Sequence, residues 1–568
     1  MNENKTDVLV IGAGAAGLRA AIEIAATGLH VIVAIKGRRG KCGATLTAGA
    51  EVDIDSASAT SLLRLSGDLR DDASLFANDM LSVGEWINNV NLVDVHVAEA
   101  PQRAKELTDW GAKTFGLIHS PGHRYPRGVV FSGIGIVRAL LKKTREFSDI
   151  EFAEEILVTD LIIDQGVIRG AVGLNFATGE VVNFWAKAVV IATGGCQSLY
   201  KFSDAPSELT GDGYGMAFRA GATFVDMEFI QFLICTMLYE PFTITPVQQL
   251  LYKGAWLLNS KNERFMKLYD TLNLEKSTRD VIARAIMSEV IQGRGTHNGC
   301  VYLSIEHLTE SEINAIADVY RKGTFATSYA YDLAFFDRLK HEPIEVFPAA
   351  HYFCGGIEIS NKCMTSVVGL FAAGEATGGT HGANRLAGNA LSEALVQGRV
   401  AGSSAARFAL DVSFEDLPRD TVSRLERKID LIDSHRTTDQ SPVQIRKLLN
   451  ELSWRHLGVL RHKGGLQELL SFIDRATMQI QNLELRNRSH SYNQEWIEAL
   501  QLPNLVLTAK IVSTTALFRE ESRGTHFRTD FPNKDERWHG CIRVLPTSRE
   551  EMNLDFKPAL THSVVTSP

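Results

Sequence analysis

The sequence predicts an α/β protein built around a Rossmann-like dinucleotide-binding domain, and three observations near the N-terminus carry this prediction. Residues 7–12, Asp-Val-Leu-Val-Ile-Gly, have the apolar run of a buried strand. Gly12, Gly14 and Gly17 follow at the spacing G-x-G-x-x-G, with Ala15 and Ala16 between the last two. A helix pattern over 18–26 and a strand pattern over 30–35 complete a β-α-β unit.

The three glycines suit a phosphate-binding turn. Glycine permits the tight turn, lets the backbone approach a pyrophosphate and lets the helix pack closely on the strand, while the helix N-terminus attracts negative charge. A carboxylate that binds ribose is expected where the second strand ends, but Ile35 is followed there by Lys36. We therefore expect the ribose to be held by backbone groups or another side chain, with Lys36 among the residues around the cofactor.

Four later segments specify the dinucleotide as FAD. A strand runs into the small-residue turn Ala192-Thr193-Gly194, and a glycine-rich turn places Asp212 before a helix. Another strand ends at Glu375, a carboxylate suited to a ribityl hydroxyl. The segment from 382 to 392 opens a helix whose N-terminus stabilises negative charge on a flavin, and its expected cofactor contacts are Arg385, Ala390, Leu391 and Ser392.

Composition narrows the class of protein. A chain of 568 residues is long enough for two to four domains. A net charge of −8 argues against a nucleic-acid partner. The sequence contains no run of about 18 apolar residues, so we expect no membrane span in this chain. The N-terminal residues enter a strand without the pattern of an export signal, so we expect a cytoplasmic protein. The seven cysteines contain no C-x-x-C pair, which argues against a metal or iron–sulfur site in this chain.

Further landmarks occur along nearly the whole chain, in a fixed order: Asn262-Glu-Arg-Phe-Met266, Ser277-Thr-Arg279-Asp280, Ala350-His351-Tyr-Phe-Cys-Gly355, His381-Gly-Ala-Asn-Arg385, Tyr492-Asn-Gln-Glu-Trp496 and 518–528. In identity and order they resemble the flavoprotein subunit of the succinate dehydrogenase/fumarate reductase family. Lys36 is similar to the Ser-Lys ending of the second strand that is common in that family.

The resemblance implies an FAD-binding domain that is interrupted by an inserted α+β capping domain and followed by a C-terminal helical domain. We place the FAD-binding domain at 1–232 and 347–412, the capping domain at 233–346 and the helical domain at 413–530. The remaining tail, 531–568, is polar and has little periodicity. It is expected to wrap a surface or to be loosely ordered.

The resemblance also implies a chemistry. The family exchanges a hydride between flavin N5 and one carbon of a C=C or CH–CH bond, and a proton at the neighbouring carbon. Cations must hold and polarise the carboxylate conjugated to that bond. The positions that match the family's motifs are Arg279, implied to be the proton donor and acceptor, and His351 and Arg385, implied to bind the carboxylate.

Two departures concern the far side of the substrate. Family members that use dicarboxylates carry a second carboxylate-binding histidine after a strand like residues 226–232, and here that position is Leu233. A threonine and a Glu–Arg proton relay are also expected, but the corresponding span, 247–254, has neither. An apparent two-residue insertion over 237–246 leaves Thr236, Thr243 or Lys253 as possible polar replacements. We expect fumarate and succinate to be poor substrates, and a 2-enoate with an apolar arm to be preferred.

A third departure concerns the flavin linkage. Family members with covalent FAD attach it through a histidine in a Ser-His-Thr stretch, and Gly43 stands in the histidine's place. Cys42 is adjacent, but we expect non-covalent FAD. The cofactor contacts implied in this stretch are Gly43, Ala44, Thr45, Ala48 and Gly49.

Two alternative functions are less consistent with the sequence, and a redox partner is expected. An amino-acid oxidase such as L-aspartate oxidase also needs a second carboxylate-binding group, and a non-catalytic electron-transfer subunit would leave the three cations unused. Because the chain lacks cluster ligands, we expect a separate iron–sulfur or other redox subunit, which would hold the protein at the inner face of a membrane. Residues 518–528 and 454–463 are the predicted docking surface for it.

Overall fold

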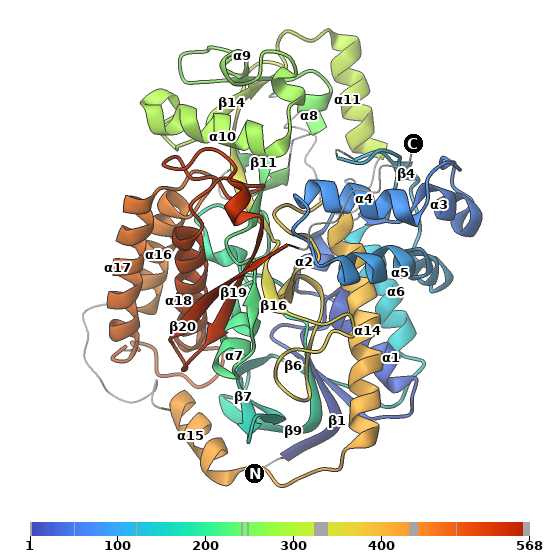
Figure 1. Ribbon diagram of the computed structural model, residues 1–568, viewed down its shortest axis with the longest axis vertical. Coiled ribbons are helices and arrows are strands. Elements are labelled where there is room, and N and C mark those ends of the chain that lie inside the picture. The colour runs from blue at the N-terminus through green and yellow to red at the C-terminus, as the bar shows by residue number, and fades with distance from the viewer. Residues whose placement is uncertain are drawn as a thin grey trace.

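The computed structural model describes residues 3–49, 51–120, 122–239, 242–246, 249–322, 339–430, 441–483 and 485–559. In Figure 1 the large sheet of the N-terminal half lies at the bottom, with long helices on one side of it. The segment between residues 230 and 353 stands above that sheet, and the C-terminal helices lie on the opposite side from the N-terminal ones.

The large sheet has the strand order β6-β2-β1-β9-β8-β7. Its parallel part contains β6, β2, β1 and β9, and β17 pairs in parallel with the end of β9. Strands β8 and β7 extend the sheet from β9 with antiparallel pairing. The bounds are β1 Glu3–Ile11, β2 Val31–Ile35, β6 Ile150–Glu154, β7 Ile156–Asp164, β8 Val167–Asn175, β9 Glu180–Ile191 and β17 Leu370–Ala372. This confirms the predicted α/β, Rossmann-like class.

Two helices from distant parts of the chain pack together against this sheet. They are α1 (Ala15–Ala25) and α14 (Asn389–Asp411). A Cβ on Gly398 would lie 2.4 Å from the Ala16 carbonyl oxygen, and one on Gly402 would lie 2.6 Å from that of Ala20. The close contact needs glycine at both positions. It brings the N-terminal ends of both helices to the same edge of the sheet (Figure 1).

A smaller layer of helices and a three-stranded sheet, β3-β5-β4, complete the N-terminal part. Its elements are α2 Ala44–Thr47, β3 Glu51–Asp53, α3 Ser56–Leu63, α4 Ala73–Val83, α5 Val90–Asp109, β4 Leu117–Ile118, β5 Gly128–Val130 and α6 Gly133–Thr144. The short helix α7 (Asp212–Arg219) follows the large sheet.

The upper part of the molecule contains an antiparallel sheet in the order β12-β11-β15-β14-β13. Its elements are β11 Ile230–Tyr239, β12 Phe242–Pro246, α8 Gln249–Tyr252, β13 Trp256–Leu258, α9 Met266–Tyr269, α10 Arg279–Glu289, β14 Val301–Ser304, α11 Glu310–Lys322 and β15 Ile344–Phe353. The predicted capping domain, 233–346, falls within this sheet and its helices, and its boundaries stay a prediction.

The C-terminal part is helical and ends in a hairpin. The helices are α15 Arg419–Asp430, α16 Pro442–His456, α17 Lys463–Ile480 and α18 Gln494–Phe518. The hairpin of β19 (Gly540–Pro546) and β20 (Met552–Pro558) joins β10 (Phe224–Val225), β16 (Gly356–Glu358) and β18 (Thr377–Gly378) in a mixed sheet. No periodic pattern predicted this hairpin in the tail.

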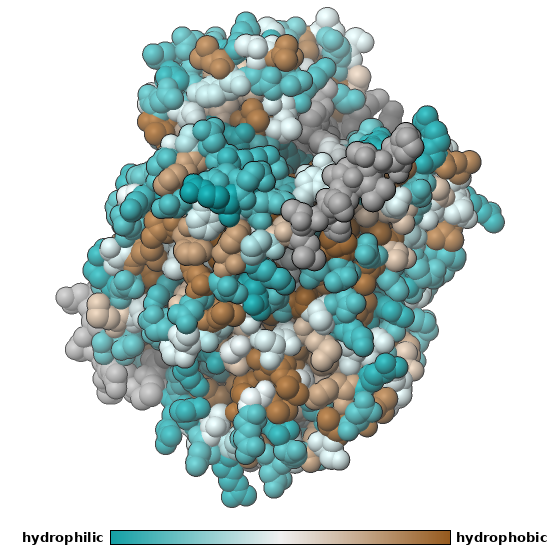
Figure 2. Space-filling view, viewed as in Figure 1, coloured by the Kyte–Doolittle hydropathy of each residue, from teal (hydrophilic) through white to brown (hydrophobic). Residues whose placement is uncertain are grey.

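The face shown in Figure 2 carries hydrophilic residues over most of its area, with hydrophobic ones in separate patches. Within the described ranges, none of the helices combines the length and the apolar character that a membrane crossing requires.

Candidate active site

A long cleft opens where the N-terminal ends of α1 and α14 meet the edge of the large sheet. It contains nearly all of the predicted cofactor contacts: Gly12, Gly14, Ala15, Ala16, Lys36, Gly43, Ala44, Thr45, Ala48, Gly49, Ala192, Thr193, Gly194, Asp212, Glu375, Arg385, Ala390 and Leu391. Residues that are up to about 380 positions apart in the sequence thus face one cavity.

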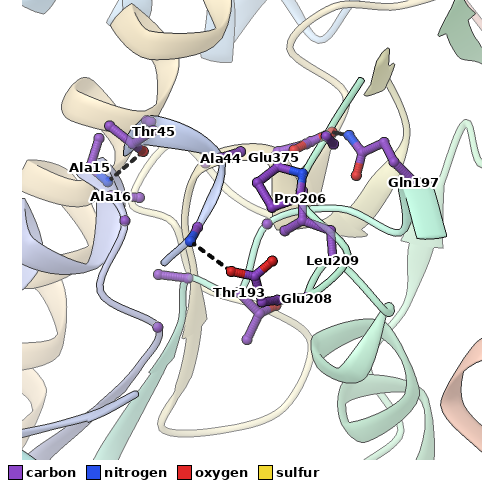
Figure 3. Close-up of a pocket in the computed structure, with 18 of the residues that line it drawn as sticks. Ala15, Ala16, Ala44, Thr45, Thr193, Gln197, Pro206, Glu208, Leu209 and Glu375 are labelled. Carbon is purple, nitrogen blue, oxygen red and sulfur yellow. Dashed lines mark hydrogen bonds between the residues drawn. The ribbon is translucent and has the colours of Figure 1, made fainter. Parts of the chain in front are cut away.

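The glycine turn shapes one wall of the cleft (Figure 3). Gly12 has a φ of +107°, and a Cβ there would lie 2.3 Å from the Ala192 carbonyl oxygen. At the start of α1, the Ala15 backbone N–H donates to the Thr45 hydroxyl at 3.0 Å. Gly17 lies outside the cleft: a Cβ there would lie 1.9 Å from the Gly12 carbonyl oxygen, so its role is packing.

The strand-end lysine contacts a carboxylate. Lys36 Nζ, at the end of β2, donates to Asp212 Oδ2 and to the Thr210 hydroxyl, both at 2.8 Å. Asp212 begins α7 and also accepts a hydrogen bond from Asn504 at 3.0 Å. Burial raises the pKa of Asp212, but the charge and hydrogen bond of Lys36 outweigh it and leave the pKa below its ordinary value. The Lys36–Asp212 ion pair thus lies at the end of β2, where an acidic residue of β2 itself was expected to bind the ribose.

Two polar groups of the cleft test whether FAD fits here. The Thr193 hydroxyl is buried and has no hydrogen-bond partner among the described residues. Glu375 accepts a hydrogen bond from the Gln197 amide (Figure 3) and another from the Phe353 N–H at 3.1 Å. An unpaired buried hydroxyl, a half-buried carboxyl and two helix N-termini along a glycine-lined wall are groups that a dinucleotide can pair with. The residues fit the cofactor.

The predicted carboxylate-binding cations contact each other. Arg385 Nη2 lies 3.0 Å from His351 Nε2 and 2.9 Å from Gln231 Oε1. His351 Nδ1 lies 2.7 Å from Asp204 Oδ2, and Arg385 lies over the ring of Tyr352, 4.7 Å from its centroid. Asp204 thereby orients the His351 ring and Gln231 orients the guanidinium. Sequence reasoning missed both positioning residues.

A β-bulge directs His351 toward the cleft. On β11, Gln231 pairs with Tyr352 and the next residue, Phe232, pairs with Ala350 on β15. His351 is therefore an extra residue between two pairs, and such bulges re-aim a side chain. Leu233, two residues after Gln231, pairs with Ala349 and lines the same cleft, where it is 4% exposed.

Arg279 enters the cleft from above. It is the first residue of α10, after the N-cap Thr278, and α10 packs on β11 and β15. Its side chain lines the cleft together with Leu233, His351 and Arg385. The three predicted catalytic residues, from three separate motifs, therefore line one cleft with the predicted cofactor contacts.

Other predicted groups lie elsewhere. Ser392 does not line the cleft; its hydroxyl accepts a hydrogen bond from the Asp53 N–H at 2.8 Å. In the span 247–254, residues 247 and 248 lie outside the described residues, while Leu250 and Leu251 are buried in the apolar core. Thr236 is buried and Lys253 is exposed, and neither lines the cleft. The side chain of Thr243 lies outside the described part.

Further lining residues were not predicted. They include the start of β7, Ile156–Val158, the loop residues Asp204, Glu208 and Leu209, and Glu51 on β3. Glu208 accepts a long hydrogen bond from the Gly43 N–H, 3.4 Å, as Figure 3 shows. These residues occur in no glycine-rich or motif-like stretch, so only the folded chain brings them to the cleft.

Family models match the two parts of the chain in turn. The FAD binding domain model matches residues 7–391, and the fumarate reductase flavoprotein C-term model matches residues 446–568. The chain belongs to the fumarate reductase/succinate dehydrogenase flavoprotein family. It is an FAD-dependent oxidoreductase that acts on CH–CH bonds, the catalytic flavoprotein subunit of that family.

Relatives of this flavoprotein cover nearly its whole length. A fumarate reductase (CoM/CoB) subunit from Methanothermobacter marburgensis is 36% identical over 94% of this chain and 96% of its own. The fumarate reductase flavoprotein subunit of Mycobacterium tuberculosis is 30% identical, with 93% of each chain covered. Among solved structures, Sdh1 of Mycobacterium smegmatis in complex with UQ1 is 31% identical with a TM-score of 0.88, covering 99% of this flavoprotein and 95% of that chain.

Four of the five arginines in the flavoprotein's predicted docking segments, 454–463 and 518–528, are not at the surface; the fifth, Arg455, is exposed, and the docking surface itself stays a prediction. Arg461, Arg519, Arg523 and Arg528 are buried, with at most 4% of each residue exposed. The two segments pair with each other, since the Arg461 N–H donates to the Phe527 carbonyl oxygen at 3.0 Å. These cations stabilise the fold and are not available to a partner.

Proposed function

We propose that this flavoprotein reduces, or forms, the C=C bond of a 2-enoate that carries an apolar arm, in preference to fumarate or succinate. One observation supports the proposal above the others. Leu233 lines the same cleft as Arg279, His351 and Arg385, so a buried aliphatic side chain borders the space that these cations line.

His351 and Arg385 would hold the substrate carboxylate. Asp204 faces His351 Nδ1, which leaves Nε2 directed at the site beside the Arg385 guanidinium. Charge-assisted hydrogen bonds from such groups are short and strong, and they polarise a conjugated C=C bond. FAD, when bound, supplies the hydride chemistry. Arg279, at the start of α10, would donate or accept the proton at the second carbon.

The apolar side disfavours a second carboxylate. A carboxylate next to Leu233 would lack charge-assisted hydrogen bonds worth about 1.5–3 kcal/mol each and would also lose hydration. An alkyl arm there would be stabilised by about 25 cal/mol for each Å² of apolar surface removed from water. The same argument disfavours an L-aspartate-type oxidase, whose substrate also carries a second carboxylate.

We further propose that FAD is bound without a covalent link. Gly43 stands in the place of the linking histidine and has no side chain to which the flavin could attach. Its φ is +87°, and a Cβ built there would meet no atom within 4 Å. Burial, more than the nearby Glu208 charge, raises the pKa of the Cys42 thiol, which disfavours the nucleophilic thiolate. Acid precipitation is expected to release all flavin into the supernatant, and flavin that stays with the denatured protein would contradict this.

Electrons would come from, or pass to, a separate iron–sulfur or other redox subunit that lies at the inner face of a membrane. Among the described residues, no group of three or more histidine, cysteine or acidic side chains is arranged to hold a metal ion. The relative from Methanothermobacter marburgensis is itself named as one subunit of a reductase. We expect NADH and NADPH not to reduce this chain directly.

The substrate proposal is tested by comparing fumarate with trans-2-hexenoate, using the FAD-loaded chain and one reduced dye as electron donor. The enoate is expected to have the higher kcat/KM, and Leu233→His is expected to shift the preference toward fumarate. Turnover of fumarate at about 10⁴ M⁻¹s⁻¹ or more, an ordinary enzyme value, with none of the enoate would overturn the proposal.

The role of Arg279 is tested by Arg279→Lys. Turnover is expected to fall by about 10²–10⁴-fold, the range of a positioned general acid, while FAD stays bound. Arg284→Lys is the matched control, since Arg284 lies on the same helix and pairs with Asp280 at 2.7 Å. Near-normal turnover by Arg279→Lys would remove Arg279 from the mechanism.

A further inference from the structure

A group of buried and half-buried ionisable side chains lies at the cleft wall and has no role in the mechanism above. Glu51 and Asp53 are two residues apart on β3, so their side chains point to the same face of the small sheet. A Cβ on Gly128, across the sheet on β5, would lie 3.3 Å from Glu51 Oε2 and 3.4 Å from Asp53 Oδ1. The two carboxyls therefore flank one point, and glycine leaves the room for them.

The inner carboxyl, Asp53, faces a histidine and a helix end. Asp53 Oδ2 lies 3.3 Å from His123 Nε2, which also lies 2.8 Å from the Ala387 carbonyl oxygen. A Cβ on Gly388, the N-cap of α14, would lie 2.3 Å from both Asp53 oxygens. The N-terminus of a long helix favours a negative charge at this place. The Asp53 carboxyl therefore lies at the N-terminus of α14, close to Glu51.

The outer carboxyl, Glu51, faces the cleft. It is half-buried and lines the cleft together with Arg279, and the Ser120 hydroxyl donates to its Oε2 at 2.7 Å. Burial and the charge of Asp53 raise the pKa of Glu51 above its ordinary value; the Ser120 hydrogen bond and the charges of Arg279 and His123 oppose them but do not prevail. A carboxyl in this environment holds a proton more firmly than an exposed glutamate does.

The other carboxyls that line the cleft are engaged elsewhere. Asp204 contacts His351, Asp212 contacts Lys36, and Glu375 accepts hydrogen bonds from Gln197 and the Phe353 N–H. Glu208 lies beside the Gly43 N–H. Glu51 lines the cleft together with Arg279, and the hydrogen bond that its side chain accepts comes from the Ser120 hydroxyl.

We propose that Glu51 is the proton donor that reloads Arg279 after each turnover, with the Ser120 hydroxyl passing protons to Glu51. The proposal rests on the proposed function, in which Arg279 gives a proton to the substrate. It supplies a route for a chain whose span 247–254 lacks an acidic relay residue.

The proton balance of the step is simple. An O–H bond of the Glu51 carboxyl breaks, an N–H bond forms on the deprotonated Arg279 side chain, and no electrons are transferred. Glu51 is left as a carboxylate beside Asp53, so repulsion between the two favours its reprotonation. The Ser120 hydroxyl donates its proton to Glu51 and takes one from water. When the reaction runs toward C=C formation, the same steps carry the proton outward.

The test is Glu51→Gln in the FAD-loaded full chain, with trans-2-hexenoate and fumarate as probes and a reduced dye as donor. Turnover is expected to fall by about 10²-fold, the lower end of the range for a positioned proton donor, with FAD content and KM close to those of the wild type. Raising the imidazole buffer concentration is expected to restore turnover of the variant and to leave the wild type unchanged, because a small acid replaces the missing donor. Glu51→Asp is expected to be intermediate.

Glu146→Gln, at an exposed position two residues after the end of α6, is the matched control and is expected to behave as the wild type. Turnover of Glu51→Gln within twofold of the wild type, or a loss that imidazole does not restore, overturns the role of Glu51. If Glu51→Gln does not load FAD, Ser120→Ala is measured in its place. Its turnover is expected to fall several-fold and to recover with imidazole, and unchanged turnover overturns the route.

Two results distinguish the failure of the Glu51 relay from the failure of the proposed function on which it rests. If Arg279→Lys loses turnover while Glu51→Gln does not, Arg279 is the acid and another group reloads it. If Arg279→Lys keeps turnover, or the wild type reduces neither probe, the proposed function fails and the relay fails with it.

Discussion

Burial determines the ionisation of the residues that line the cleft. Glu375 is half-buried within the cleft wall, and burial raises its pKa to about 7, although the Phe353 N–H, the Gln197 amide and the Arg385 charge all lower it. The carboxyl is therefore partly protonated at neutral pH before any cofactor hydroxyl contacts it. This is a property of the surroundings, which the identity of the residue as glutamate does not reveal.

The raised pKa of Glu375 gives a pH-dependent stability. Because the folded chain binds this proton more tightly than the unfolded chain, the contribution is complete below about pH 4.3 and is lost as pH rises to 7, a loss of roughly 3–4 kcal/mol. Glu375→Gln imitates the protonated form. Thermal unfolding of the FAD-free chain is expected to show the variant gaining stability over the wild type between pH 5 and pH 8. A difference that does not change with pH would contradict the assignment.

Residues in short motifs were predictable, and those that act through folding were not. Arg279, His351 and Arg385 each stand in a distinctive stretch, and the structure brings all three to one cleft. Asp204 and Gln231 orient two of them, yet they are 147 and 154 residues from the groups they contact. No local spacing signals such pairs. Glu51 is similar, because its importance comes from Asp53, Ser120 and Arg279 around it.

The turn between β1 and α1 shows how one element combines two demands. A Cβ on Gly17 would lie 1.9 Å from the Gly12 carbonyl oxygen, whereas one on Gly14 would meet only the Thr45 hydroxyl, at 3.3 Å. Gly17 therefore serves the packing of helix on strand, and Gly14 leaves room for an approaching phosphate. The G-x-G-x-x-G pattern predicts all three glycines but does not show which of them serves packing and which serves phosphate binding.

Alanine at the two positions is expected to give different results. Gly14→Ala is expected to leave the thermal unfolding of the FAD-free chain unchanged and to weaken FAD binding by about tenfold or more, roughly 1.4 kcal/mol. Gly17→Ala is expected to lower the unfolding temperature or prevent folding, because a backbone atom cannot move aside. Fluorescence titration with FAD and a thermal scan check both. Equal effects of the two variants would show that the division of roles is wrong.

Elements without a periodic pattern were the hardest to predict. The hairpin of β19 and β20 lies in a polar stretch, and it is stabilised by pairing with β10, which is about 320 residues earlier in the chain. The bulge at His351 likewise depends on the register between β11 and β15. Both features depend on partner strands that are distant in sequence, so composition gives no sign of them.

In the whole molecule, buried arginines link the C-terminal segments to the FAD-binding part. Arg519 Nε donates to Glu228 Oε1 at 2.8 Å, and Arg461 Nη1 donates to the Glu228 carbonyl oxygen at 2.6 Å. Arg528 contacts the end of α18 and Asp530. The sequence suggested a docking surface because the segments are rich in cations. Charge in a sequence does not show whether a side chain is exposed, and here it is paired internally.

Replacing one of these arginines is therefore expected to affect folding first. Arg528 Nη1 donates to the carbonyl oxygens of Ala516, Leu517 and Arg519 at 3.0–3.2 Å, and the side chain is fully buried. Arg528→Met would leave these acceptors and Asp530 without their partner, at a cost of roughly 3–5 kcal/mol. The FAD-loaded variant is expected to unfold at a clearly lower temperature than the wild type. Arg537→Met, at a position whose side chain is 87% exposed, is the control and is expected to unfold as the wild type does. A variant that unfolds like the wild type but loses activity with its native electron donor would instead support the docking surface.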